Sequence, residues 1–283
     1  MTTQLVWLIT GCSSGFGQEF VSQILARGDL VIATSRNVNK IRHLEQPGVS
    51  LQQLDVTDSQ ESLNETISKA ISIHGRVDVL VNNAGYIVVG SWEDLRYEDF
   101  LAQFETNVFG VIKVTRAVLP HLRKHQSSTL VFISSRSGWY GDPFCGAYAG
   151  SKFALEGIVE SLRWEVEPFG IRTLLIDPGR FRTPFLFSGG NLTRAESRVA
   201  DYRQAYQRFL DAIAREDGNQ PGDVRKGVGV IVDLVRKEGL AKDKEVPFRV
   251  PLGTDCYETI EEECEKTLST LRHWESVIKA TDY

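Results

Sequence analysis

Short apolar runs alternate with helix-patterned segments through the first two thirds of this 283-residue chain. Each run ends in turn-forming or polar residues, which is typical of buried parallel strands. Strands that alternate with helices form βαβ units, and these build a parallel sheet with helices on both faces. We therefore predict an α/β fold, a doubly wound parallel sheet of Rossmann type with about seven strands. The clearest strands are Leu5–Ile9, Leu30–Thr34, Ser50–Asp55, Val77–Asn82, Thr129–Ser134 and Ile171–Ile176.

Helices are predicted between these strands. Apolar spacing indicates helices from Phe16 to Arg27, from Tyr97 to Lys124 and from Tyr148 to about Val166. Asp58, followed three residues later by Glu61, predicts a capping box at the start of the helix after the third strand.

The chain shows no internal repeat and no low-complexity linker, so we expect a single domain over residues 1–283. Residues 185–223 are charged but carry a helical stripe of Tyr202, Tyr206 and Phe209. This stripe fits either a helix that buries it in the core or a helical lid over a substrate. Residues 252–283 are predicted as a C-terminal helical extension with a structural role.

Candidate site residues follow several of the predicted strands. Gly11, Asp55, Asn82, Ser135 and Pro178 all lie at or just after a strand end. The carboxyl ends of parallel strands meet at one edge of the sheet, where doubly wound folds bind their ligands. We therefore expect one ligand site at this edge.

A glycine-rich turn connects the first strand to the first helix. Its sequence is TGCSSGFG, from Thr10 to Gly17, with the spacing G-x-x-x-G-x-G. Glycines there permit a tight turn and let a pyrophosphate approach the backbone at a helix N-terminus. A purely structural turn is the alternative, but the position in the first βα connection favours a dinucleotide.

The end of the second strand indicates which dinucleotide binds. An acidic residue there would bind the free 2′-hydroxyl of NAD. The segment ATSRN carries no acid and one base, Arg36. A guanidinium can pair with a 2′-phosphate, whereas a carboxylate would repel it. We therefore predict NADP(H) as the cofactor; the alternative is that Arg36 is an ordinary solvated side chain.

Ser135, Tyr148 and Lys152 form a candidate proton-transfer group. Tyr148 and Lys152 are four residues apart, so a helix places them on one face. A lysine ammonium favours the phenolate form of a neighbouring tyrosine, which makes the phenol a usable acid or base. A Tyr-x-x-x-Lys pair alone is also common on solvated helix faces. These groups transfer no hydride, so a cofactor must do so.

Taken together, these motifs resemble the short-chain dehydrogenase/reductase family. The resemblance covers about Leu5 to Thr183 and extends more weakly to the branch of 17β-hydroxysteroid and retinol dehydrogenases and related microbial reductases. The matching motifs are TGCSSGFG (Thr10–Gly17), NNAG (Asn82–Gly85), Asn107 in FETNVFG, Ser135 in ISS, YAGSK (Tyr148–Lys152) and PGRFRT (Pro178–Thr183).

The resemblance implies a catalytic tetrad. Tyr148 would be the general acid in reduction and the base in oxidation, and Ser135 would hydrogen-bond the substrate oxygen. Lys152 would lower the pKa of Tyr148 and hold the nicotinamide ribose. Asn107 would hold a water that links Lys152 to solvent.

The resemblance also implies a set of cofactor contacts: the phosphate turn, the adenosine end and the nicotinamide end. The expected cofactor-binding residues are Gly11, Ser13, Ser14, Gly15, Phe16, Gly17, Arg36, Asp55, Val56, Asn83, Ala84, Gly85, Tyr148, Lys152, Pro178, Gly179 and Thr183. Family members are commonly dimers or tetramers, often through the helices that carry Asn107 and Tyr148, so we expect a homo-oligomer.

Aromatic residues around the tetrad indicate an apolar substrate pocket, although several of these rings could instead pack into the sheet or a subunit interface. Such a pocket would suit a bulky hydrophobic small molecule. The candidate pocket residues are Tyr86, Trp139, Tyr140, Phe144, Phe185 and Phe187.

Composition excludes several other classes of function. The net charge of −5 gives no electrostatic footprint for nucleic acid. No apolar stretch is long enough to span a membrane, and the N-terminus lacks a signal-peptide pattern. Four scattered cysteines have no metal-ligand spacing, so we expect free thiols, no metal site and a cytoplasmic location.

The sequence therefore predicts an NADP(H)-dependent oxidoreductase that interconverts a ketone or aldehyde and an alcohol. The alternative is a non-catalytic NADP(H)-binding sensor or scaffold on the same fold, since a fold does not determine function.

Overall fold

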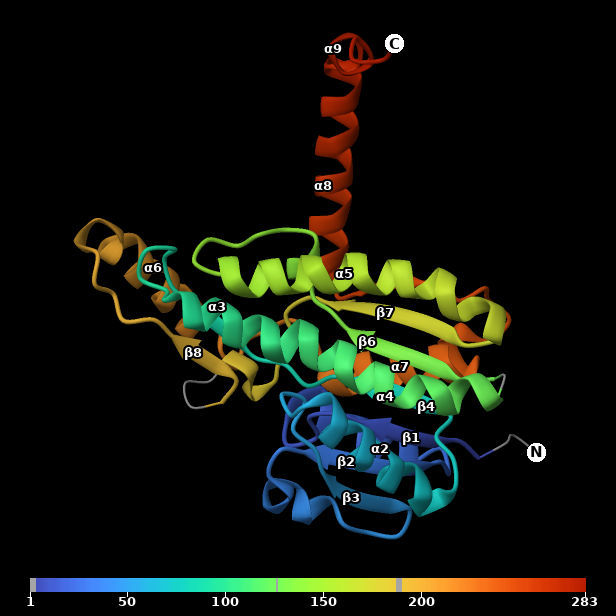
Figure 1. Cartoon of the computed structure of the whole chain (residues 1–283). Coiled ribbons are helices and arrows are strands. Elements are labelled where there is room, and N and C mark those ends of the chain that lie inside the picture. The colour runs from blue at the N-terminus through green and yellow to red at the C-terminus, as the bar shows by residue number, and fades with distance from the viewer. Residues whose placement is uncertain (1–3, 126, 187–189) are drawn as a thin grey trace.

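The computed structural model describes residues 4–125, 127–186 and 190–283. At its centre is a seven-stranded parallel sheet with the order β3-β2-β1-β4-β6-β7-β9 (Figure 1). This arrangement confirms the predicted doubly wound fold. The strands are β1 (Val6–Ile9), β2 (Leu30–Ser35), β3 (Val49–Gln53), β4 (Val79–Asn82), β6 (Thr129–Ile133), β7 (Arg172–Pro178) and β9 (Arg249–Leu252).

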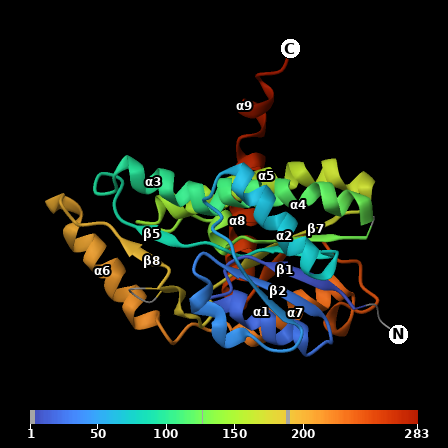
Figure 2. The same cartoon turned by 60° about the horizontal axis from the view of Figure 1, so that its bottom comes forward.

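Helices cover both faces of the sheet (Figures 1 and 2). On one face lie α1 (Gly15–Leu25) and α7 (Val224–Arg236). On the other lie α2 (Gln60–His74), α4 (Gly110–His125) and α5 (Gly146–Val166). The remaining α-helices are α3 (Tyr97–Phe104), α6 (Ala200–Glu216), α8 (Thr254–His273) and α9 (Glu275–Lys279), and short 3₁₀ turns cover Val38–Leu44, Arg136–Gly138, Glu167–Phe169, Pro184–Leu186 and Gly239–Ala241.

The core lies in two layers, one on each side of the sheet. Along β1, Trp7 and Ile9 pack with α1 and α7, whereas Val6 and Leu8 pack with α2, α4 and α5. All four side chains are buried because both faces of the strand are covered. This double burial explains why the strands are continuous apolar runs in the sequence.

The predicted helix from Tyr97 to Lys124 is present, but its winding changes in the middle. α3 ends at Phe104, residues Glu105–Phe109 form a π-helical turn, and α4 continues to His125. Single π turns inside α-helices are often found at functional sites. Asn107 lies in this turn. The apolar pattern did not reveal the π turn, because one additional residue in a helical turn changes the spacing of the apolar positions very little.

The predicted capping box at Asp58 is wrong by one residue. The N-cap of α2 is Ser59, whose hydroxyl oxygen accepts a hydrogen bond from the backbone N–H of Ser62 at 3.2 Å. A serine side chain is short enough to reach back to the first free N–H groups of the helix. Asp58 therefore lies outside the helix.

A second, two-stranded parallel sheet was not predicted. It pairs β5 (Ile87–Val89) with β8 (Leu192–Arg194). β8 and α6 both belong to the segment 185–223, and Figure 2 shows them together at one end of the molecule. The pairing joins residues about a hundred positions apart, a distance at which local sequence patterns carry no information.

Candidate active site

The predicted site residues meet at the carboxyl edge of the central sheet. The glycine-rich turn follows β1, and Asn83 to Gly85 follow β4. These two segments are joined by hydrogen bonds: the Asn83 side-chain amide donates to the carbonyls of Thr10 (2.9 Å) and Gly11 (3.0 Å). The Thr10 hydroxyl oxygen accepts from the N–H groups of Asn83 and Ala84. The turn is thus held rigidly against the neighbouring strand end.

Steric constraints require glycine at two positions of the turn. A Cβ atom on Gly17 would lie 2.2 Å from the carbonyl oxygen of Gly11 and 2.7 Å from the Asn83 side-chain nitrogen. Gly11 has a φ of +74°, and a Cβ there would lie 2.8 Å from the Cα of Ala84. No other residue type fits either position without moving the backbone.

The N-terminus of α1 is open to a ligand. Ser14 is the N-cap residue, but its side chain makes no capping hydrogen bond, and the first turn carries no acidic residue. The first N–H groups of a helix have no partner within the helix, and they attract anions. Ser13 beside them is exposed. These features fit a pyrophosphate.

The segment Pro178–Thr183 lies over the same turn. A Cβ on Gly15 would lie 3.5 Å from the Cβ of Thr183, and the Phe16 and Phe181 rings meet edge to face with centroids 5.1 Å apart. The two motifs, more than 160 residues apart in the sequence, therefore border one space.

The expected adenosine contacts lie at the ends of β2 and β3. Arg36 directly follows β2 and is exposed, with no hydrogen bond or ion pair to the described residues. Asp55 is partly buried, and its Oδ1 accepts from the N–H (2.9 Å) and hydroxyl (2.8 Å) of Thr57. Val56 is buried beside Gly110. The exposed Arg36 guanidinium at the end of β2 suits a 2′-phosphate.

Asn107 connects the π turn to the rest of the site. Its Oδ1 accepts from the N–H of Tyr86 at 3.2 Å, and its Nδ2 donates to the carbonyl of Tyr86 (3.0 Å) and to the hydroxyl of Ser151 (3.2 Å). Ser151 in turn donates to the carbonyl of Tyr148 at 2.7 Å. Asn107 thus ties the loop after β4 to helix α5.

Ser135, Tyr148 and Lys152 come together as the sequence predicted. Ser135 follows β6, and its hydroxyl lies close enough to Tyr148 to lower the pKa of that phenol. Lys152 lies one helical turn after Tyr148 on α5, with its Nζ 5.8 Å from the centre of the Tyr148 ring. Its ammonium donates to the carbonyl of Ile133 at 2.8 Å. Tyr148 and Lys152 are both buried.

Burial dominates the pKa values of this group. It raises the pKa of Tyr148 to about 12, and the Ser135 hydroxyl offsets only part of that shift. It also lowers the pKa of Lys152 to about 8, against the attraction of Glu156 and Asp177. The expected lowering of the Tyr148 pKa by Lys152 is not found, because burial dominates and also disfavours the charged form of Lys152. Tyr148 is a neutral acid at neutral pH.

An apolar cluster surrounds the Tyr148 ring. The centre of the Phe185 ring lies 6.2 Å from that of Tyr148, and Phe144 packs at a tilt against Tyr206 and Phe209 of α6. Tyr206 is buried and donates to the Val89 carbonyl at 3.0 Å. Two rings of the predicted stripe on α6 are thus packed beside the site, whereas the third, Tyr202, is exposed.

The other predicted pocket residues are placed differently. The indole N–H of Trp139 donates to Asp177 at 3.1 Å. Tyr140 is exposed and lies beside Arg136. A pocket role for these two rings stays a prediction. Tyr86 packs with Val88, Leu95 and Ala147. Phe187 lies outside the described residues.

Sequence reasoning missed a buried carboxyl pair behind Lys152. Glu156 lies one turn further along α5, and Asp177 lies near the end of β7; both are buried, and they lie close enough for Glu156 to raise the pKa of Asp177. The Nε of Arg249 lies 2.9 Å from Oε2 of Glu156, and its Cζ lies 5.1 Å from the centre of the Trp139 ring. The spacing of four from Lys152 could have revealed Glu156.

The pair is best described as sharing one proton. Oε1 of Glu156 and Oδ1 of Asp177 accept no hydrogen bond from the described part of the chain. A proton shared between the two carboxyl groups would provide the missing donor. The pKa of Asp177 is raised to about 8, first by burial and then by the neighbouring Glu156. In the unfolded chain the pKa of Asp177 is near 3.8. Between that pH and about pH 8, the native state therefore binds one proton more than the unfolded state.

This linkage predicts a pH-dependent stability. A raised carboxyl pKa stabilises the fold at low pH, and the stabilisation is lost as pH rises toward 8. We expect Asp177→Asn, which keeps an acceptor for Trp139 and gains a donor for Glu156, to lose less stability than the parent between pH 6 and pH 8. Urea unfolding at both pH values measures this, with the exposed Asp58→Asn as control. Equal losses in Asp177→Asn and the parent would contradict the shared proton.

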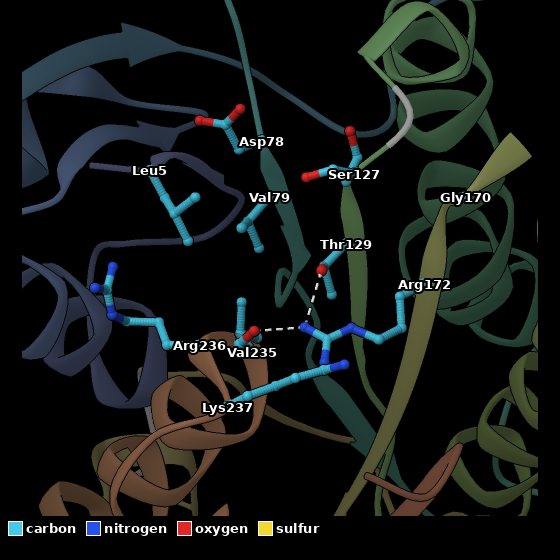
Figure 3. Close-up of a pocket in the computed structure, with 11 residues that line it drawn as sticks. Leu5, Asp78, Val79, Ser127, Thr129, Gly170, Arg172, Val235, Arg236 and Lys237 are labelled. Carbon is cyan, nitrogen blue, oxygen red and sulfur yellow. Dashed lines mark hydrogen bonds between the residues drawn. The ribbon is translucent and has the colours of Figure 1, made fainter. Parts of the chain in front are cut away.

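A cavity of about 420 Å³ lies at the opposite, amino edge of the sheet (Figure 3). Arg172 donates there to the Thr129 hydroxyl (3.2 Å) and to the carbonyls of Leu234 (3.3 Å) and Val235 at the end of α7. A cation at this place satisfies carbonyls that a helix end leaves without partners. We therefore interpret this cavity as structural.

Two further observations concern the described ranges as a whole. None of their helices combines the length and apolar character needed to cross a membrane. They also contain no group of three or more His, Cys, Asp or Glu side chains arranged to hold a metal ion.

Comparisons with known proteins found a matching family model, similar structures and curated relatives. The family model described as short chain dehydrogenase matches residues 5–189. A structure titled as a short-chain dehydrogenase from Streptomyces avermitilis superposes with a TM-score of 0.87 at 35% identity, covering 99% of this chain and 100% of that one.

Three curated relatives are similar over most of the chain. An uncharacterized oxidoreductase, YusZ, from Bacillus subtilis is 37% identical over 96% of both chains. A 3-ketodihydrosphingosine reductase from Bacteroides thetaiotaomicron is 36% identical over 89% of both. Retinol dehydrogenase 8 from Bos taurus is 38% identical over 81% of this chain and 78% of its own length.

Proposed function

This chain belongs to the short-chain dehydrogenase/reductase family, and we propose that it interconverts a carbonyl and an alcohol with NADP(H) as cofactor. It is an oxidoreductase close to the retinol dehydrogenases of that family, as its motifs predicted. The observation that carries the proposal is the Ser135–Tyr148–Lys152 group beside the open N-terminus of α1.

The residues at the carboxyl edge fit a dinucleotide. The Gly11–Gly17 turn and the N–H groups of α1 would hold the pyrophosphate, and Arg36 the 2′-phosphate. Asp55 and Val56 would border the adenine, Asn83 to Gly85 the middle of the cofactor, and Pro178, Gly179 and Thr183 its nicotinamide end. When bound, the nicotinamide supplies or accepts the hydride.

The chain's own groups handle the proton. Ser135 would donate a hydrogen bond to the substrate oxygen and hold it beside the Tyr148 hydroxyl. Tyr148, a neutral acid by its raised pKa, would give its proton to that oxygen as negative charge develops. Lys152 would then stabilise the phenolate, and Asn107 would hold a water on the path that returns a proton from solvent.

The apolar cluster supports a bulky hydrophobic substrate. Phe144 and Phe185 lie beside Tyr148, and α6 covers them with Tyr206 and Phe209. We propose that residues 185–223 act as the substrate lid. The names of two relatives point the same way, since 3-ketodihydrosphingosine and retinol each carry a keto or alcohol group on a largely apolar molecule.

A direct assay tests the proposal. NADPH oxidation is measured with ketones and aldehydes of increasing apolar size, and with small polar carbonyl compounds as controls. We expect turnover with the bulky apolar compounds and little with the small polar ones. NADPH binding without turnover on any carbonyl compound would instead support a sensor or scaffold.

Arg36 is predicted to decide the choice of cofactor. Arg36→Asp is expected to weaken NADPH binding by about tenfold or more, because hydrogen bonds between charged groups contribute about 1.5–3 kcal/mol. NADH binding should not weaken. Arg42→Asp makes the same charge change at a nearby exposed position and serves as control. Titration of each cofactor measures both affinities; an equal loss in the two variants would contradict a specific contact.

A further inference from the structure

Helix α8 leaves the body of the molecule and projects alone (Figure 1). Its first turn is anchored: the Cys256 thiol contacts the Asp177 carbonyl at 3.1 Å, and Asp255 accepts from the N–H of Arg180 at 2.8 Å. From Glu261 to His273 the helix is exposed except for the partly buried Glu263, and Figure 1 shows it standing clear of the sheet. The anchored base sets its direction.

One side of this projecting helix is apolar. Tyr257, Cys264 and Leu271 follow one another at intervals of seven residues, with Ile260 and Trp274 between and after them. This is the spacing of the a and d positions of a coiled coil. We call these five residues the α8 stripe. Leu268 flanks it.

The stripe is exposed to an unusual degree for a helix in water. Tyr257 is 58% exposed, Leu271 50% and Trp274 52%. Helices in proteins gain most of their stability from packing an apolar face, and isolated ones are marginal even when long. Contiguous apolar surface of this kind marks an interaction site. The α8 stripe therefore offers a surface that a partner helix would cover.

The charges on α8 identify that partner. From Asp255 to Glu265 the helix carries six carboxylates and no lysine or arginine: Asp255, Glu258, Glu261, Glu262, Glu263 and Glu265. The half that follows carries Lys266, Arg272 and His273 and no acidic residue. A parallel second α8 would place six carboxylates against six, whereas an antiparallel one brings each acidic half beside a basic half.

We propose that α8 is a dimerisation arm that pairs antiparallel with the α8 of a second copy through the α8 stripe. Such a contact is isologous, because the same surface serves both copies and a two-fold axis closes the assembly. The helix is about 30 Å long at 1.5 Å per residue, so the two arms overlap along their length while the bodies lie at opposite ends. Cys264, near the middle of α8, then lies close to its counterpart.

The first test is the oligomeric state of the full chain. Sedimentation velocity over a range of concentrations should show a dimer for the parent and a shift of at least tenfold in the dimer dissociation constant for Leu271→Glu. Ser269→Glu adds the same charge two residues earlier on the opposite side of the helix and should dimerise like the parent. Circular dichroism checks that α8 stays helical in both variants.

The second test uses Cys264 as a chemical handle, since Cys12, Cys145 and Cys256 are buried and Cys264 is exposed. A short bis-maleimide should join two chains through Cys264, and Cys264→Ser should abolish the product. A monomeric parent would overturn the proposal. A dimer that Leu271→Glu leaves intact and that the reagent does not join would also overturn it, and would place the contact on another face.

Discussion

Replacement of Tyr148 by phenylalanine is expected to lower turnover at least about a hundredfold, the usual scale for a proton-transfer group. The change removes only the hydroxyl, so the ring can keep its packing beside Phe185. Ser135 would still hold the substrate oxygen, but no acid would remain beside it. NADPH binding should be nearly unchanged, because the change leaves the phosphate turn, Arg36 and Lys152 in place. Steady-state turnover and cofactor titration measure the two effects separately.

Tyr140→Phe is the matched control for this prediction. It removes the same hydroxyl from an exposed tyrosine that lies beside Arg136. Turnover of this variant should equal that of the parent. Near-normal turnover of Tyr148→Phe would show that the phenol is not the acid, and the proposed function would then lose its proton source.

Gly17→Ala is expected to damage the dinucleotide site most among changes outside the tetrad. The added Cβ would lie 2.2 Å from the Gly11 carbonyl oxygen, and a real contact of that length does not exist. The turn must move, which is expected to cost about 1–3 kcal/mol of stability. A shifted turn also misplaces the N–H groups that face the pyrophosphate, so NADPH affinity should fall at least about tenfold.

Gly157→Ala provides the comparison. This glycine lies inside α5, and a Cβ there meets nothing within 4 Å. Alanine is the better helix former, so the variant should gain about 0.5–1 kcal/mol. Unfolding in urea and NADPH titration measure both variants. If Gly17→Ala binds NADPH as tightly as Gly157→Ala, the turn does not hold the cofactor.

Much of the fold could be predicted from the chain because the information is local. The strands are buried on both faces, so each appears as a continuous apolar run, and their alternation with helices indicates βαβ units and a parallel sheet. The same reasoning failed for the sheet of β5 and β8, since Ile87 and Leu192 meet only after the rest of the chain has folded.

The tetrad was predictable for a related reason. Tyr148 and Lys152 lie on one helix face, so their spacing alone brings them together. The pKa of Tyr148 was not predictable, because it depends on how much water the surrounding elements exclude. Trp139 shows the same limit. Its sequence position suggested a place in the pocket, but no local pattern indicates that its N–H donates to Asp177 of β7.

By itself, the sequence determined the parallel sheet, the edge at which its ligand residues gather and the identity of the residues at that edge. Strand and helix periodicity and short-range spacing decide these features. Only the tertiary structure decided that burial raises the pKa of Tyr148, that Glu156 and Asp177 share a buried site, and that α8 projects from the body of the molecule. These depend on burial and on contacts between distant segments, which no local pattern records.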